Sequence, residues 1–371
     1  MTARRHVVVV LPPKEGFAPT SSGAIGLVVR DVARATAGEW DTTVIGREAG
    51  GEPFPGPAFI ESPGSAFWRA TLGLNRAYLF GLRRALRAAA PDIIEVHNRI
   101  PLALDVARAA AGVPTMLVLH NDPQEMRAAR TPAERSSLLQ RLAGVIGVSE
   151  WVRDRMIEGV EDPALRRKAH AIPNGLDLAL APQAPAERDR LILFVGRITA
   201  NKGFDSFVRA CALALPRLPG WRAEAIGADR FRADSPDTKF IRAVRPEAEA
   251  AGVRMLGFQD NTRTLAAMSR AAVVVMPSRW AEPLGRVAQE AQLAGAPLIT
   301  TRRGGLPEAA GEAALYVDPE KPEEIAEAIE RIARDAALAA RLREAGAHQV
   351  RRFGLPETQA RWSALRRSLL G

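Results

Sequence analysis

Short runs of Val, Ile and Leu alternate with longer, Ala- and Arg-rich stretches along the first half of the chain. The short runs have the length of buried strands, whereas the longer stretches space their apolar residues as helices do. The predicted strands are 7–11, 43–45, 93–96, 116–119 and 145–148, and the predicted helices are 26–37, 67–89 and 102–111. Strands that alternate with helices in this way form parallel sheets with helices on both faces.

The same alternation starts again after a Pro- and Ala-rich segment at 181–186, which has the composition of a linker. Strands are predicted at 191–195, 223–226, 254–256, 272–276 and 297–300, with a helix from about Phe204. The sequence therefore predicts two doubly wound, Rossmann-like α/β domains, 1–180 and 188–354, with the boundary near 178–188. Ligands of such sheets bind beyond the carboxyl ends of the strands, so we expect the chemistry in the loops there.

The composition agrees with two globular domains. The 371 residues are 47% apolar and 25% charged. The single cysteine, Cys211, excludes a disulfide framework, and its apolar helical surroundings predict a buried, unreactive thiol. The apolar run 7–11 is too short for a signal peptide, and no stretch approaches the roughly 18 apolar residues of a membrane span. A cytoplasmic protein is expected.

The charge of the chain widens the choice of partners. The formal net charge is +9, and only five of the 51 basic residues are Lys. So strong an excess of Arg is typical of a GC-rich coding sequence and is not by itself a functional signal. A basic chain nevertheless raises nucleic acid, anionic lipid and nucleotide phosphates as partners. Nucleic acid is disfavoured, because the sequence has no helix-turn-helix pattern, zinc-ligand spacing or interleaved aromatic and basic residues.

One segment concentrates this charge. Between Gly64 and Pro91 five arginines alternate with apolar residues and no acidic residue occurs; the arginines are 69, 76, 83, 84 and 87. The pattern predicts an amphipathic helix, Arg69–Arg87, that rests on anionic lipid at the inner face of the cytoplasmic membrane or holds an acidic acceptor. The alternative is a packed helix whose solvent face happens to be rich in Arg.

The first candidate for chemistry comes after the predicted strand 191–195. Gly196 ends that strand without a side chain, which lets a ligand approach the backbone. Arg197 and Lys202 then bracket a loop that leads into a helix. Two cations together with free backbone N–H groups suit a diphosphate. An ordinary loop with solvated charges is the alternative.

The second candidate comes after the predicted strand 272–276. Glu282 precedes Pro283 and is expected just before a helix, and Glu290 comes eight residues later. On a helix this spacing is about two turns, which places the two carboxylates on nearly one face about 12 Å apart. The two carboxylates would then bind two separate sets of hydroxyl groups. A nucleotide sugar offers such sets on its transferred sugar and on its ribose, and the diphosphate would lie between them near Gly285. Either Glu alone would be read as a solvated helix residue.

At these residues the sequence resembles a family. The motifs Gly196-Arg197-x4-Lys202-Gly203, Glu282-x7-Glu290 and Gly304-Gly305-Leu306-Pro307-Glu308 are similar to the donor-site signatures of retaining family-4 glycosyltransferases of the GT-B fold. The segment 172–177, Ile-Pro-Asn-Gly-Leu-Asp, resembles the family's motif just before the linker. The four motifs occur in the family's order over residues 172–308.

The resemblance implies a donor site in the C-terminal domain and an acceptor site in the N-terminal domain, across a cleft, with a C-terminal helix at about 355–371 that packs back on the first domain. It gives Arg197 and Lys202 to the donor diphosphate, Glu282 to the transferred sugar and Glu290 to the ribose. Leu284 stands where the family usually has Phe, which changes the shape of the pocket and leaves its polar groups in place. The base pocket would lie near Gly227 and Leu256-Gly257-Phe258.

The resemblance also reaches the N-terminal half. The loop 21–26, with Gly23, matches the family's loop over the donor phosphate, although turn chemistry alone would explain its glycines. His120 ends the strand 116–119 and matches a His that contacts the sugar near the reacting carbon. His97 has a similar position with less support. A structural, hydrogen-bonded His is the alternative for both, and neither is expected to act as a nucleophile.

No Asp-x-Asp motif and no His/Cys set with metal-ligand spacing occurs in the sequence. This absence favours a metal-independent, cofactor-free enzyme, and the resemblance implies a retaining hexosyltransferase that uses a UDP- or GDP-linked sugar. The expected acceptor is a glycan or glycolipid of bacterial lipopolysaccharide or exopolysaccharide assembly. The alternatives are a nucleotide-sugar epimerase or phosphorylase of the same fold, an inactive relative, and a basic nucleic-acid-binding protein.

Overall fold

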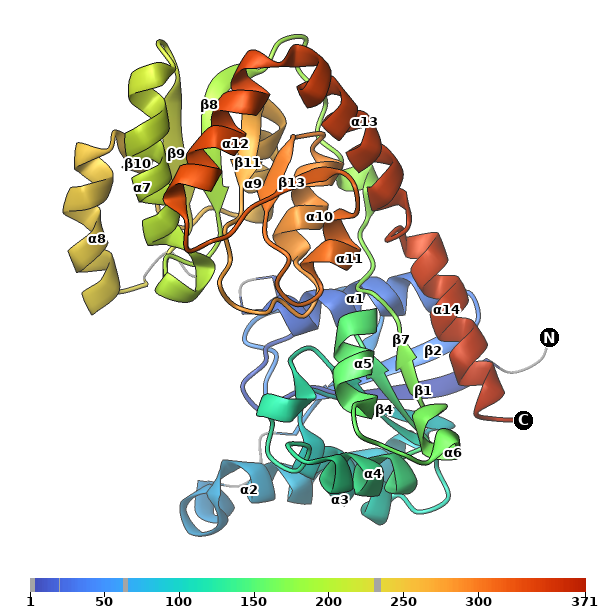
Figure 1. Cartoon of the computed structure of the whole chain (residues 1–371). Coiled ribbons are helices and arrows are strands. Elements are labelled where there is room, and N and C mark those ends of the chain that lie inside the picture. The colour runs from blue at the N-terminus through green and yellow to red at the C-terminus, as the bar shows by residue number, and fades with distance from the viewer. Residues whose placement is uncertain (1–3, 20, 63–65, 230–234) are drawn as a thin grey trace. The chain divides into compact units, whose positions relative to one another are not determined.

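The computed structural model describes residues 4–19, 21–62, 66–229 and 235–371 (Figure 1). The chain divides into two compact units. Unit 1 is Met1–Asp177 together with Gly354–Gly371, and unit 2 is Leu178–Phe353. Each unit is built on one parallel sheet, so the predicted fold class, doubly wound parallel α/β, is confirmed.

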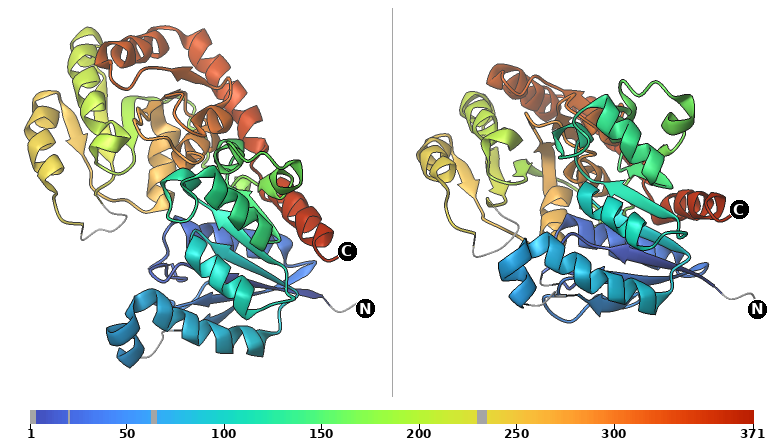
Figure 2. Two further views of the ribbon diagram at one scale, coloured as in Figure 1. Left: turned by 60° about the horizontal axis from the view of Figure 1, so that its bottom comes forward. Right: turned by 90° about the horizontal axis from the view of Figure 1, so that it is seen from below.

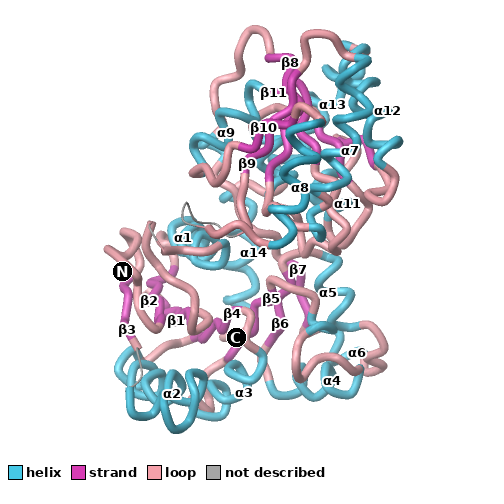
Figure 3. Tube along the Cα trace, turned by 90° about the vertical axis from the view of Figure 1, so that its left-hand side faces the viewer, coloured by secondary structure: helices cyan, strands magenta, loops and turns pink. Residues whose placement is uncertain are grey.

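Unit 1 contains a seven-stranded parallel sheet with the order β3-β2-β1-β4-β5-β6-β7. Its strands are β1 (Arg5–Val10), β2 (Trp40–Gly46), β3 (Ala58–Glu61), β4 (Ile93–His97), β5 (Thr115–Leu119), β6 (Gly144–Gly147) and β7 (Ala169–Ala171). Its helices are α1 (Ala24–Thr36), α2 (Ala66–Ala89), α3 (Ile100–Ala109), α4 (Pro132–Arg141), α5 (Glu150–Ile157), α6 (Pro163–Arg166) and α14 (Leu355–Ser368), with a 3-10 turn η1 (Pro123–Glu125). Helices α1 and α14 lie on one face of the sheet, and α2 and α3 lie on the other (Figure 3).

Unit 2 contains a six-stranded parallel sheet with the order β10-β9-β8-β11-β12-β13. Its strands are β8 (Asp189–Val195), β9 (Arg222–Ile226), β10 (Val253–Met255), β11 (Ala271–Val275), β12 (Leu298–Thr300) and β13 (Ala314–Tyr316). Its helices are α7 (Phe204–Ala214), α8 (Lys239–Ala250), α9 (Asn261–Arg270), α10 (Arg286–Leu293), α11 (Leu306–Ala310), α12 (Pro322–Arg334) and α13 (Ala336–Arg351). The 3-10 turns are η2 (Leu178–Leu180), η3 (Ala200–Lys202) and η4 (Leu215–Arg217).

The faces of the second sheet are covered by different helices (Figure 2). Helices α7, α8 and α12 share one apolar cluster with β8, β9 and β11, and α9 packs beside α10. Cys211 lies fully buried in the cluster, and burial raises the pKa of its thiol. The predicted burial of Cys211 is therefore confirmed.

The strands that the sequence did not predict, β3, β7 and β13, form edges of the two sheets. Strand β3 is half-exposed, and β7 and β13 have three residues each. The hydrophobic periodicity of a strand needs about four residues or more to be recognised, and an edge strand alternates only weakly. These strands are therefore defined by pairing with their neighbours.

The C-terminal helix α14 belongs to unit 1 through a buried ion pair. The Arg366 guanidinium donates to both carboxylate oxygens of Glu95 in the central strand β4, at 2.7 and 3.1 Å. It also donates to Thr36 Oγ1 at 3.1 Å and lies between the rings of Trp40 and Trp362. Because both charges are buried, this bidentate geometry is what makes the pair tolerable, and it holds α14 against α1.

Candidate functional site

Three glycines come close together at the carboxyl edge of the second sheet. Gly196 follows β8, Gly227 follows β9 and Gly257 follows β10. The Gly227 N–H donates to the Gly257 carbonyl at 2.8 Å, and a Cβ on Gly227 would lie 1.8 Å from the Gly196 carbonyl oxygen. Only glycine fits this approach, because Gly227 also has a φ of +144°. The edge therefore presents bare backbone where the base pocket is predicted.

The loop after Gly196 carries the two predicted cations. Residues Ala200–Lys202 form the 3-10 turn η3, and Gly203, with a φ of +69°, leads into α7 at Phe204 as predicted. A Cβ on Gly203 would lie 1.9 Å from the carbonyl oxygen of Pro277, so glycine is required for this turn to pack against the loop after β11. The turn thereby brings the loops of two neighbouring strands together.

Lys202 and Glu282 meet at this contact. The Lys202 ammonium donates to Glu282 Oε1 and lies 4.8 Å from the centroid of the Trp280 ring. Ser278 Oγ donates to the same carboxylate oxygen at 2.8 Å. The Glu282 side chain is only 6% exposed and that of Lys202 is 15% exposed, so the pair is shielded from water and its charges interact strongly. Two residues separated by 80 positions thus form one cation–carboxylate centre.

Arg197 lies in the same loop and is half-buried. Its guanidinium makes no hydrogen bond or ion pair with any of the residues that the structure describes. A guanidinium offers five N–H donors, which suit a phosphate group in two-point contact. Arg197 is therefore available to an anion, whereas Lys202 must exchange its carboxylate partner for one.

The segment Glu282–Gly285 is held by the predicted Gly304-Gly305 motif. The Gly305 N–H donates to the Glu282 carbonyl at 2.6 Å, and Glu282 pairs with Gly304 in an isolated parallel bridge. A Cβ on Gly304, which has a φ of +64°, would lie 2.3 Å from the Glu282 carbonyl oxygen. The two glycines are needed because they allow this backbone to sit directly on the segment that presents Glu282.

The structure corrects one prediction about the glutamates. Helix α10 begins only at Arg286, so Glu282 lies on extended backbone four residues before it. The prediction that Glu282 and Glu290 project from one helix face is therefore wrong, and the helical spacing of about 12 Å does not apply to them. Gly285, with a φ of +98°, forms the N-cap of α10, and Leu284 beside it is buried. The turn at Pro283–Gly285 is what a helical spacing rule could not anticipate.

Glu290 has partners of its own. Its Oε1 accepts from Arg286 Nε at 2.9 Å and from Asn261 Nδ2 at 3.0 Å. Its side chain is 8% exposed. The two donors fix one carboxylate oxygen and leave the other for a ligand, as a residue that binds hydroxyl groups requires.

Unit 1 places the two predicted histidines in contact. His97 Nδ1 and His120 Nε2 are 2.9 Å apart, at the carboxyl ends of the neighbouring strands β4 and β5. Burial lowers the pKa of His120 to about 4. Burial, together with the charges of His120 and Arg366, lowers the pKa of His97 well below its usual range. The pair is therefore uncharged at neutral pH, and one ring donates to the other.

The loop with Gly23 differs from the simple expectation of an open phosphate-binding turn. Gly23 forms the N-cap of α1, and the Gly26 N–H donates to Glu15 Oε1 at 2.9 Å. Burial raises the pKa of Glu15, and hydrogen bonds from Gly26 and Gly23 oppose that rise. The positive end of the helix thus already faces a carboxylate of the same chain.

The basic segment forms the helix α2, as predicted. Leu82 and Leu86 are buried, whereas Arg83, Arg84 and Arg87 are exposed. The side chains of residues 66–76, including Arg69 and Arg76, lie outside the part of the chain that the structure describes. Among the described residues no helix is both long and apolar enough to cross a membrane.

The residues 4–19, 21–62, 66–229 and 235–371 contain no cluster of three His, Cys, Asp or Glu side chains suited to a metal ion. The expected metal independence stays a prediction.

Sequence reasoning missed several partners of the predicted site. Ser278, Arg279 and Trp280 lie next to one another in the loop after β11, and Asn261 begins α9. The first three stand just ahead of Glu282, and a polar run between a buried strand and a predicted site was the available signal. Asn261 is 29 positions from Glu290, so nothing in the local sequence connects the two.

The comparisons with known proteins agree with this geometry. Residues 179–349 match the model of the glycosyl transferases group 1, and residues 25–180 match that of glycosyltransferase family 4. Glycogen synthase of Mycobacterium tuberculosis is 30% identical over 303 residues, which are 76% of this chain and 69% of that protein.

Solved structures show the same fold. Sucrose-phosphate synthase from Thermosynechococcus elongatus has a TM-score of 0.76 and 22% identity, with 98% of this chain and 99% of that chain covered. HepE of Anabaena, solved with UDP-glucose, has a TM-score of 0.75 and 17% identity, with 98% and 99% covered. The protein therefore has the GT-B architecture.

The family is established by the sequence matches. The chain belongs to the group 1, or family 4, glycosyltransferases, and the suspected family is confirmed. Its class of activity is glycosyl transfer, which the matches favour over the epimerase, phosphorylase and nucleic-acid-binding alternatives.

Proposed function

We propose that this glycosyltransferase moves a hexose from a nucleoside-diphosphate donor, UDP- or GDP-linked, to a glycan or glycolipid acceptor with retention at the anomeric carbon. The structure of HepE with UDP-glucose supports a nucleotide-sugar donor, because that protein shares this fold over nearly the whole chain. A role in bacterial lipopolysaccharide or exopolysaccharide assembly is the pathway that we propose.

The contact between Lys202 and Glu282 is the observation that carries this proposal. A diphosphate needs a cation, and a sugar needs an acceptor for its hydroxyl hydrogens; here both groups meet at the carboxyl edge of one sheet. Arg197 adds a second, unpartnered cation in the described part of the same loop. When a donor binds, its diphosphate takes Lys202 from Glu282 and leaves that carboxylate to the sugar.

The chemistry then depends on the departing diphosphate. The bond between the anomeric carbon and the phosphate oxygen breaks, and the acceptor oxygen bonds to the same face of that carbon. The acceptor proton passes to the departing phosphate oxygen. Arg197 and Lys202 stabilise the negative charge that develops there, without a metal ion or a cofactor. Glu282 positions the sugar, and Glu290 binds the ribose together with the backbone at Gly196, Gly257 and Gly285.

Unit 1 is proposed to bind the acceptor. His120 contacts the transferred sugar, Gly23 closes on the donor phosphate, and the exposed arginines of α2 approach an anionic membrane from the cytoplasm. The neutral His97–His120 pair supports a hydrogen-bonding role, because an uncharged imidazole can accept or donate without adding charge.

A donor screen tests the proposal. The protein is incubated with UDP-, GDP- and ADP-linked hexoses, and slow hydrolysis is measured beside the shift in melting temperature. We expect at least one donor to be hydrolysed and to stabilise the wild type, and the Lys202→Ala variant to respond far less. Equal responses of both proteins to every donor would refute the assigned site.

A further inference from the structure

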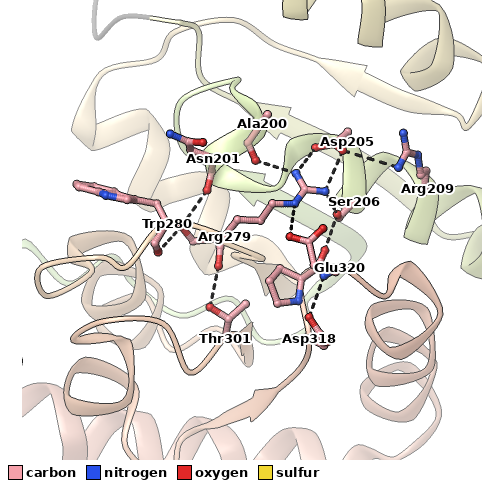
Figure 4. Close-up of polar contacts among 12 residues, drawn as sticks. Ala200, Asn201, Asp205, Ser206, Arg209, Arg279, Trp280, Thr301, Asp318 and Glu320 are labelled. Atoms are coloured by element: carbon pink, nitrogen blue, oxygen red, sulfur yellow. Dashed lines mark hydrogen bonds and ion pairs between the residues drawn. The ribbon is translucent and has the colours of Figure 1, made fainter.

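Arg279 makes the densest set of polar contacts around the candidate diphosphate loop (Figure 4). Its guanidinium donates to both carboxylate oxygens of Asp205, at 2.6 and 2.9 Å, and to Ser206 Oγ at 2.6 Å. It also donates to the Ala200 carbonyl at 2.8 Å and lies 3.0 Å from Glu320 Oε1. One side chain therefore joins the loop after β11 to the turn η3, the first turn of α7 and the loop before α12.

The backbone at Arg279 and Trp280 also forms hydrogen bonds with the turn η3. The Asn201 carbonyl accepts from the N–H groups of Arg279 and Trp280 at 2.9 and 3.0 Å. Asn201 immediately precedes Lys202. Through the side chain and the main chain, the Arg279 loop fixes two of the three residues of η3, and thereby the point from which the Lys202 ammonium reaches out.

The charges explain why this residue is Arg. Asp205 lies in the first turn of α7, only three residues from Lys202, where an unpaired carboxylate would repel a diphosphate. Its side chain is 16% exposed, and its other cation, Arg209, lies 3.8 Å away and is 57% exposed. Arg279 neutralises Asp205 by two-point contact, and the hydrogen bonds that the guanidinium donates to Asp205 raise its own pKa. With its donors occupied, Arg279 has little left to offer a ligand.

We propose that Arg279 is a positioning residue for the donor diphosphate. It holds the turn η3 so that Lys202 meets the phosphate, and it cancels the charge of Asp205 at the start of α7. This inference rests on the proposed function of Lys202. It predicts that Arg279 strengthens diphosphate binding only indirectly, by positioning Lys202 and by neutralising the charge of Asp205.

A double-mutant cycle tests the proposal. The affinity of the wild-type protein for UDP, GDP and ADP is measured by calorimetry, and the tightest of the three is used with Arg279→Ala, Lys202→Ala and the double variant. Arg279→Ala alone should weaken binding by about tenfold, and much less in the Lys202→Ala background, because coupled residues are not additive. Asp205→Asn should restore part of the affinity of Arg279→Ala, whereas Arg279→Lys should rescue only partly because Lys lacks the planar fork.

The matched control is Arg222→Ala. Arg222 also bridges two carboxylates, those of Asp189 and Glu224, but it begins β9 and so lies at the opposite edge of the same sheet. Its removal should leave the affinity unchanged, and melting temperatures report any general loss of folding in each variant.

The outcomes separate the two claims. If Lys202→Ala binds the nucleotide as tightly as the wild type, the proposed diphosphate site is wrong and the inference falls with it. If Lys202→Ala weakens binding while the effect of Arg279→Ala is absent, or adds in full to that of Lys202→Ala, only the positioning role is wrong.

Discussion

The carboxyl edges of the two sheets are built for different tasks. In unit 2 the edge is charged: Lys202 pairs with Glu282, Arg279 pairs with Asp205, and Arg197 makes no ion pair with a described residue. In unit 1 the corresponding edge carries the His97–His120 pair, which burial keeps neutral. The same topology can therefore supply either a site that stabilises charge or one that forms hydrogen bonds without adding charge.

The difference originates in the residues at the end of each strand. After β8 and β11 come loops rich in Arg, Lys and Glu whose glycines let them pack against each other, as at Gly203 and Pro277. At the ends of β4 and β5 the chain places a His, of which His97 is buried and His120 is half-buried. Substitutions should therefore affect the charged edge through donor binding and turnover, and the neutral edge through the pH dependence of stability.

Removal of a cation from the charged edge should have the largest effect. Arg197→Ala and Lys202→Ala should each lower turnover by about a hundredfold or more, because each removes a group that stabilises the departing diphosphate. Arg197→Lys should recover only part of the activity if the Arg197 guanidinium makes a bidentate contact with the diphosphate. Arg254→Ala, which loses a 2.7 Å contact with Glu224 in the middle of β9, is the control. Near-normal turnover in both alanine variants would assign the loop a structural role only.

Loss of the sugar-binding carboxylate should come next. Glu282→Ala should reduce transfer by tens- to a hundredfold, or about 2–3 kcal/mol, since it removes a charged hydrogen-bonding group from the sugar as it reacts. Steady-state kinetics with the matched donor measure this effect. A change confined to KM, with kcat unaffected, would show that Glu282 contributes only uniform binding.

The neutral His97–His120 pair should make the free energy of unfolding depend on pH. The pKa of His120 is about 4 in the folded protein, against about 6.5 in an unfolded chain. Between these values only the unfolded chain binds the proton, so the free energy of unfolding should fall as the pH drops from 7 to 5, by on the order of 1–2 kcal/mol. Urea unfolding of the wild type and His120→Gln at both pH values tests this. An equal loss of stability in the two proteins would mean that His120 is not held neutral.

The smallest expected effect is that of chelation. Activity should persist in EDTA, because guanidinium and ammonium groups neutralise the diphosphate in the proposed site. Assays with and without EDTA, and with added Mg²⁺ or Mn²⁺, measure it. Complete loss in EDTA with recovery on addition of either ion would place a metal in the reaction.

Much of this architecture could be predicted from the sequence, and the exceptions have physical causes. The long central strands and the start of α7 at Phe204 result from hydrophobic periodicity, which burial on both faces makes strong. The arrangement of Glu282 and Glu290 does not follow from hydrophobic periodicity, since the turn at Pro283–Gly285 is held by Gly304 and Gly305 from another loop. Likewise the contact of Lys202 with Glu282, and that of Arg279 with Asp205, joins loops that are adjacent only because β8 pairs with β11.

Calorimetry with a bare nucleoside diphosphate tests the central claim most directly, because such a ligand contains the ribose and the diphosphate but lacks the hexose that is transferred. Whichever of UDP, GDP and ADP binds the wild type most tightly is titrated into Glu290→Ala and Glu282→Ala. Glu290→Ala should bind it clearly more weakly, since the ribose loses its carboxylate partner. Glu282→Ala should bind it as tightly as the wild type or more tightly, because its removal frees Lys202 for the diphosphate. Loss of binding in Glu282→Ala with full binding in Glu290→Ala would contradict the account and reverse the direction of the donor in this site.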